Sequence, residues 1–186
     1  MSVAADTGAL VLRATVGGYM AAHGAQKLFG VLDGPGMQGT AGFMEMIGLR
    51  PGQYWAGAAA AGEFGGGVLT ALGFLNPLGP IGIVSAMAMA TQKAHIGKGI
   101  FASTGGPELT LTTIAAAVAL AMGGPGTVSL DRAFGLRLPR WLTAAVAVGA
   151  TATVVYGMMQ SPTPPPADAA QAAAEGHDVA IGVENA

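Results

Sequence analysis

The sequence predicts an all-α protein that crosses a membrane several times. Charged residues make up 10% of its 186 residues, against roughly 25% in soluble proteins. Apolar residues make up 52%, and the mean hydropathy is +0.53. Several apolar runs approach the roughly 20 residues that an α-helix needs to cross a hydrocarbon core of about 30 Å. We therefore expect a polytopic membrane four-helix bundle with an additional fifth C-terminal transmembrane helix.

Charge and cysteine content exclude several classes of function. The net charge of -2 provides no basic field that would attract nucleic acid, so we expect no nucleic-acid partner. The chain has no cysteine, which removes thiolate chemistry, iron–sulfur ligation and cysteine zinc sites. Redox chemistry would therefore need a bound cofactor. The first apolar run lacks a basic leader and a clear cleavage site, so we interpret it as a retained span.

The first predicted span covers residues 8–29. Arg13 lies near its start, and we expect its charged end to reach the inner lipid headgroups. The connection over residues 30–53 opens with the turn sequence Asp-Gly-Pro-Gly at residues 33–36. Residues 40–49 then show helical periodicity but are too few to span, which indicates a short interfacial or re-entrant helix.

The second predicted span, residues 54–75, opens with Tyr54 and Trp55, aromatic residues typical of a membrane boundary. Its single charge is Glu63. Gly62 and Gly66 form a Gly-x-x-x-Gly pair, so one face of this helix can pack closely on a neighbour.

The third and fourth spans follow across short connections. Residues 76–80 form a proline- and glycine-rich hairpin, and residues 81–96 form the third span, which ends in a polar segment that contains Gln92, Lys93 and His95. The fourth span begins at Glu108 and continues to about residue 122, where a glycine-rich turn stops it.

Two segments follow the four spans. Residues 135–160 hold an apolar run at 141–159, which we expect to be the additional fifth span. Residues 161–186 form a proline- and alanine-rich acidic tail that we expect to be disordered.

The arginines indicate the orientation in the membrane. Arg132, Arg137 and Arg140 share one short loop, which indicates that this loop is cytoplasmic. The N-terminus is then inside and the tail outside. Three other cations, Lys27, Arg50 and Lys98, count against this orientation.

Ionisable residues gather at one membrane level in this topology. The first and third spans both end at the outer face, and Glu63 is expected roughly 13 Å deeper. Because ionisable side chains inside a membrane are costly, such groups indicate a functional site. We predict a polar pocket in the outer half of the bilayer formed by His23, Gln26, Lys27, Glu63, His95 and Glu108.

Several motifs in order resemble the DoxX family of small bacterial membrane proteins. They are His-Gly-Ala-Gln-Lys-Leu-Phe-Gly at residues 23–30, Asp-Gly-Pro-Gly-Met-Gln-Gly-Thr at 33–40, Glu63 with its glycines, His95, Gly-Gly-Pro-Glu-Leu at 105–109 and Gly-Pro-Gly-Thr-Val-Ser-Leu-Asp-Arg at 124–132. The resemblance covers residues 8–134 and implies a four-span domain over residues 1–134 in the bacterial inner membrane. Related DoxD-type subunits belong to thiosulfate:quinone oxidoreductases, and some DoxX proteins are linked to membrane complexes that handle sulfur and oxidative stress.

The resemblance and the polar residues together predict a membrane subunit of a quinone-linked oxidoreductase system, with protein partners in a redox complex. His23 and Lys27 would bind the head of menaquinone or ubiquinone, Glu63 and Glu108 would move or balance protons, and His95 would complete the pocket.

Other interpretations of the polar residues remain open. Lys27 or Lys93 can pair with Glu63 or Glu108 to neutralise charge and fix the packing, as in a structural or assembly subunit without activity of its own. Transport of a small molecule or lipid would leave the same polar pocket. The two histidines could ligate haem, and a His–Glu metal site fits the residue types without a diagnostic spacing, but we predict no metal site.

Overall fold

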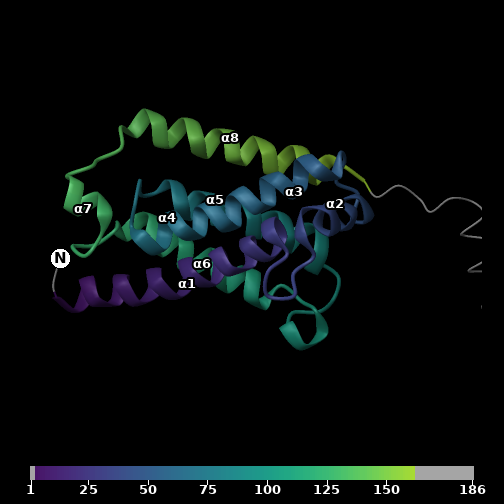
Figure 1. Cartoon of the computed structure of the whole chain (residues 1–186), viewed down its shortest axis with the longest axis horizontal. Coiled ribbons are helices and arrows are strands. Elements are labelled where there is room, and N and C mark those ends of the chain that lie inside the picture. The colour runs from purple at the N-terminus through teal and green to yellow at the C-terminus, as the bar shows by residue number, and fades with distance from the viewer. Residues whose placement is uncertain (1–2, 162–186) are drawn as a thin grey trace, which may run out of the picture.

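The computed structural model describes residues 3–161, within which every regular element is a helix (Figure 1). The predicted tail from residue 162 onward lies outside the described residues. The α-helices are α1 (Val3–Phe29), α2 (Gly36–Met46), α3 (Gly52–Ala60), α4 (Gly66–Leu72), α5 (Leu78–Ala90), α6 (Glu108–Gly123), α7 (Leu130–Phe134) and α8 (Arg140–Met159). Two π-helical turns, η1 (Ala61–Gly65) and η2 (Thr91–His95), and a 3-10 turn, η3 (Ala102–Thr104), complete the set.

The second and third predicted spans are each interrupted by a π-helical turn. The backbone stays right-handed helical through Ala61 (φ −63°, ψ −43°) and Gly65 (φ −63°, ψ −48°), so α3, η1 and α4 form one rod over residues 52–72. Residues 78–95 form a second rod in the same way, because Thr91 is also helical. At 1.5 Å per residue these rods are about 30 Å long, which matches the thickness of a hydrocarbon core.

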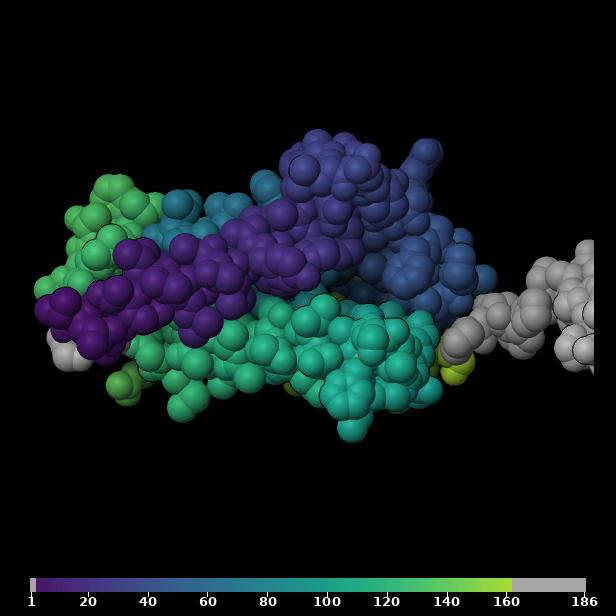
Figure 2. Space-filling model, turned by 90° about the horizontal axis from the view of Figure 1, so that it is seen from below, coloured from purple at the N-terminus to yellow at the C-terminus, as the bar shows by residue number. Residues whose placement is uncertain are grey.

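The all-helical fold class is confirmed, whereas the number of membrane spans stays a prediction. By length and composition, α8 is the one described helix that is long and apolar enough to cross a membrane, and α6 is a shorter apolar helix. The short helix expected after the first span is present as α2. Figure 2 shows α1 running along the same face of the molecule as α6.

Glycines set how closely the helices approach. A Cβ on Gly17 of α1 would lie 2.7 Å from the carbonyl oxygen of Gly67 in α4 and would also overlap the backbone of Ala71. On the opposite side of the same rod, Gly62 and Gly66 face the backbone of α5, where a Cβ on either would lie 2.9 Å from a carbonyl oxygen. The expected close packing of the Gly-x-x-x-Gly face is therefore confirmed, and α1 packs on a second glycine face of that rod.

Arg13 is buried, with 4% of its surface exposed, so the expectation that it reaches the lipid headgroups is wrong. Its guanidinium Nε donates to the carbonyl oxygen of Ala71 at 3.1 Å, and its two terminal nitrogens donate to the carbonyl oxygens of Pro125 and Val128. Ala71 lies in the last turn of α4, where carbonyls have no partner within the helix. Arg13 turns inward because it satisfies those carbonyls and joins α1, α4 and the loop before α7.

Asp131, at the same end of the molecule, fixes the turn that follows α4. Its two carboxylate oxygens accept from the backbone N–H groups of Leu75 and Asn76, at 2.7 and 2.8 Å. It lies in α7, a short helix with a capping residue at each end. The Ser129 side chain caps the N-terminus by accepting from the N–H of Arg132, and Gly135, in the left-handed region, caps the C-terminus. The prediction from sequence alone contained no helix here.

Two neighbouring glycines of α1 test the packing. Gly17→Ala places a methyl group against the backbone of α4, and we expect a loss of about 1–3 kcal/mol of unfolding free energy. Gly18→Ala meets nothing within 4 Å, so the higher helix propensity of alanine should add up to about 1 kcal/mol. Unfolding of both variants in detergent measures the difference, and equal stabilities would contradict this crossing of α1 and α4.

Candidate functional site

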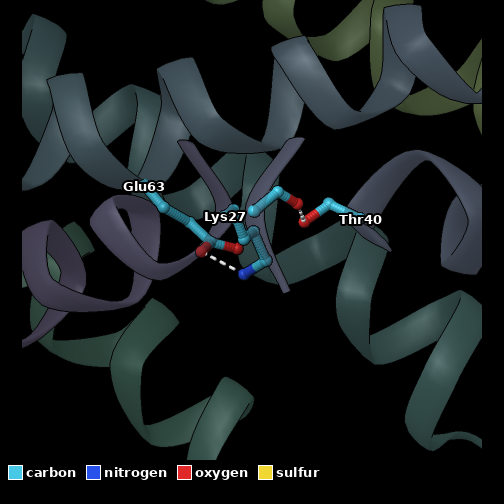
Figure 3. A network of polar contacts seen from close by, with 4 residues as sticks. Lys27, Thr40 and Glu63 are labelled. Carbon is cyan, nitrogen blue, oxygen red and sulfur yellow. Dashed lines mark hydrogen bonds and ion pairs between the residues drawn. The ribbon is translucent and has the colours of Figure 1, made fainter. Parts of the chain in front are cut away.

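Lys27 and Glu63 form an ion pair between α1 and η1 (Figure 3). The Glu63 side chain is 4% exposed and the Lys27 side chain 25% exposed. An unpaired carboxylate at this burial would be costly, so Lys27 is what allows Glu63 to be charged there. The pairing of a lysine with a glutamate was one of the interpretations left open by the sequence.

The predicted depth of Glu63 is wrong, because its carboxylate contacts Lys27 directly instead of lying roughly 13 Å below it. The reason is the course of α1. Gly24 packs against the backbone of Phe64, which places the last turn of α1 beside η1 in the middle of the rod rather than beside its end. The sequence-based depth of Glu63 was counted along each helix as if the helices were parallel, so it did not allow for α1 crossing the rod beside η1.

Both π-helical turns carry predicted site residues. Glu63 lies in η1, and His95 lies in η2. A π-helical turn inserts one residue into the helical repeat and is frequently found at functional sites. Each turn therefore changes the direction of the side chains that it carries, Glu63 in η1 and His95 in η2, while the rod continues as a helix.

A cavity of about 560 Å³ extends from the ion pair along the groove between α8 and the two rods. Its polar part is formed by Lys27, Glu63, His95 and Lys98. Its walls are otherwise largely apolar, and they include Phe43, Met44 and Ile47 of α2, Trp55 and Ala59 of α3, Ile81, Ser85 and Met89 of α5, and Val146, Ala150, Thr153 and Val154 of α8. The cavity is therefore polar at one end and apolar along most of its length.

His95 is held in one orientation. Its Nδ1 lies 2.8 Å from the carbonyl oxygen of Gly105, and because a carbonyl only accepts, Nδ1 carries the proton. The other ring nitrogen, Nε2, is left without a partner among the described residues and is therefore a hydrogen-bond acceptor. His95 thus brings an available imidazole nitrogen to the wall of the cavity.

The structure does not place the other three predicted residues at the described cavity. The ring of His23 packs edge-on against Tyr19, with centroids 4.5 Å apart. Gln26 donates through Nε2 to the carbonyl oxygen of Leu32 at 3.0 Å. Glu108 is exposed, and its carboxylate accepts from the N–H of Ala102 at 2.8 Å. Gln26 and Glu108 fix loops, whereas Lys27, Glu63 and His95 share one cavity.

Two groups of lining residues were missed from the sequence. Lys98 lies in a loop that was treated only as a connection. The wall from α8 was missed because the fifth helix was interpreted as an addition to the bundle, although Val146, Ala150 and Val154 recur every four residues, the spacing of one helix face.

The end of α8 is fixed beside the cavity by polar and aromatic contacts. Gln160 accepts from the N–H of Arg50 at 2.7 Å and donates to its carbonyl oxygen at 3.0 Å. The rings of Trp55 and Tyr156 stack with centroids 6.0 Å apart, and Lys93 donates to the carbonyl oxygen of Gln160. These contacts hold α8 on α3 and η2, so it forms a stable wall.

Comparison with known proteins gives one match. The model of the DoxX family matches residues 8–96, a segment that contains Lys27, Glu63 and His95 and ends before Lys98, α6 and α8. No curated protein and no solved structure matches the chain significantly.

The ion pair can be tested by a double-mutant cycle. Lys27→Met leaves Glu63 buried and unpaired, and because part of Lys27 is exposed we expect a loss of about 2–3 kcal/mol, below the range for fully buried pairs. The double variant Lys27→Met, Glu63→Met removes both charges and should regain most of that stability. Unfolding in detergent measures each variant, and simple additivity of the two single losses would contradict a coupled pair.

Proposed function

We propose that this chain is an integral membrane subunit of a quinone-linked oxidoreductase system. The proposal starts from the match of residues 8–96 to the DoxX family, whose members are membrane proteins associated with oxidoreductase and stress functions. The setting we propose is the bacterial inner membrane, in a complex of the thiosulfate:quinone type or one that responds to oxidative stress. The cavity at Lys27 and Glu63 would bind the quinone.

The observation that carries the proposal is one continuous cavity with a polar end and a long apolar wall. A quinone has the same division, because its ring carries two carbonyl oxygens and its isoprenoid tail is apolar. Lys27 and Lys98 offer N–H donors to a carbonyl oxygen, and His95 offers Nε2 as an acceptor to the hydroxyl of the quinol. The small and apolar side chains of α5 and α8 provide the surface against which the tail would pack.

A bound menaquinone or ubiquinone would supply the two-electron chemistry, taking up two electrons and two protons to become the quinol. This chain contributes proton handling and orientation. Glu63 can take a proton and pass it on, and Lys27 balances its charge when it is ionised. His95, whose Nδ1–H is bonded to Gly105, presents Nε2 as a proton acceptor. In this proposal the electrons come from a partner protein, because the chain has no cysteine with which to bind an iron–sulfur centre or form a redox-active disulfide.

One observation favours a second candidate, a structural or assembly subunit. Lys27 and Glu63 already neutralise one another, as expected if their role is to fix the packing of α1 on η1. This role predicts that a chain without residues 161–186 keeps its bundle but loses co-purifying redox proteins. A quinone-binding role predicts that the shortened chain keeps its quinone.

A pair of alanines on α8 tests the quinone site. Ala150 lines the cavity, so Ala150→Leu should fill part of the apolar wall and lower the quinone content of the purified protein severalfold. Ala152 is exposed on the same helix and does not line the described cavity, so Ala152→Leu should keep the content of the unmodified chain. Quinone is extracted from each preparation and quantified per mole of protein.

Substitution at the polar end separates the two candidate functions. Glu63→Gln keeps the shape of the side chain but removes its charge and its ability to take up a proton, and we expect quinone to be lost or no longer reduced. His23→Ala alters a ring outside the described cavity and should retain quinone. If the unmodified protein carries no more quinone than an unrelated membrane protein of similar size, quinone binding is excluded.

A further inference from the structure

A second cavity lies at the opposite end of the molecule, next to α7, and it plays no part in the proposed quinone site. It has a volume of about 700 Å³ and is formed by the glycine-rich segment 123–127, by Asn76, and by residues of α7 and the chain that follows it. Figure 1 places α7 at the left end, far from α2, which contributes residues to the wall of the first cavity.

Positive charge dominates this second cavity. Arg132 and Arg137 both line it, and within residues 3–161 neither guanidinium has an ion-pair or hydrogen-bond partner. The single acid in the lining, Asp131, is already engaged, because its two oxygens accept from the N–H groups of Leu75 and Asn76 and it lies close enough to Arg13 to interact with its charge. Two uncompensated guanidinium groups therefore face one cavity.

The backbone of the cavity adds donors to these charges. Gly124 and Gly126 have positive φ values of 82° and 76°, so the segment folds in a conformation that side-chain-bearing residues rarely adopt. The N–H of Gly126 has no partner among the described residues. Guanidinium groups bind phosphate oxygens in a bidentate manner, and free backbone N–H groups in turns contribute to anion sites.

The surroundings of the cavity are those of a membrane boundary. Leu136 and Leu138 contribute apolar surface to its lining, and the exposed Trp141 lies in the first turn of α8, shortly after them in the chain. Arginines concentrated in one short loop indicate the cytoplasmic side, where the leaflet carries anionic lipids. A phosphate attached to an acyl chain fits a cavity that is cationic and also partly apolar.

We propose that Arg132 and Arg137, together with the backbone of the 123–127 turn, bind the phosphate headgroup of an anionic phospholipid of the inner leaflet. The inference rests on the proposed membrane location but is independent of quinone binding. The shared chemistry is a phosphate, and the acyl chain distinguishes a lipid from a free phosphate ion.

The test uses the full chain purified in a neutral detergent and supplemented with phosphatidylglycerol or phosphatidylcholine. Native mass spectrometry counts the lipid molecules that each preparation retains. We expect the unmodified chain to prefer phosphatidylglycerol, and the variant Arg132→Gln, Arg137→Gln to bind it about tenfold or more weakly. Arg140→Gln removes one positive charge at the first residue of α8 without touching the described cavity, and it should bind like the unmodified chain. Each single variant, Arg132→Gln or Arg137→Gln, also removes one charge and should bind more weakly than Arg140→Gln.

Each other outcome overturns the proposal. If Arg140→Gln weakens binding as much as substitution at the cavity, the effect is general charge attraction rather than a site. If inorganic phosphate displaces the lipid, the ligand is a free phosphate ion. If phosphatidylcholine binds equally well, the headgroup charge is not recognised. Melting curves of the variants confirm that they fold, and an unchanged quinone content separates this test from that of the proposed function.

Discussion

The close contact between α1 and the rod formed by α3, η1 and α4 determines where every polar group of the first cavity lies. Gly17, Gly24 and Gly67 remove side chains from this contact, so backbone meets backbone. Because the helices cross so closely, the last turn of α1 passes beside η1 and Lys27 reaches Glu63. Bulkier residues at these positions would separate the helices and leave a buried carboxylate without its cation.

The two ends of the molecule solve the problem of buried charge in different ways. At the end near η1, one ion pair remains beside a cavity, where an imidazole and a second lysine are also available. At the end near α7, Arg13 donates hydrogen bonds to backbone carbonyl groups, and Asp131 accepts hydrogen bonds from backbone N–H groups of a turn. The first arrangement leaves groups free for chemistry, whereas the second fixes the connections between helices.

Much of the helix arrangement could be predicted from the sequence, because hydrophobic run length follows directly from the thickness of a bilayer. The close glycine face at Gly62 and Gly66 was also accessible, since small residues four apart lie on one face. The π-helical turns were not, because hydropathy does not distinguish a helix from one with an inserted residue. The direction of Arg13 was also missed, since it depends on carbonyls from segments distant in sequence. Within the predicted site, Lys27 and Glu63 do contact each other, as expected of opposite charges that neutralise one another, whereas Gln26 bonds to its own loop. Whether these residues form a functional site stays a prediction.

The position of α8 has a consequence for how a ligand enters the first cavity. The DoxX match ends at residue 96, yet α8 supplies one wall of the cavity and is attached at its far end through Gln160 and Arg50. In the proposed membrane setting, the outer face of this helix would contact the acyl chains of the bilayer, so a hydrophobic ligand such as the proposed quinone would arrive by lateral diffusion in the plane of the membrane. Its effective concentration would then be set by its abundance in the lipid, and a weak site would remain filled.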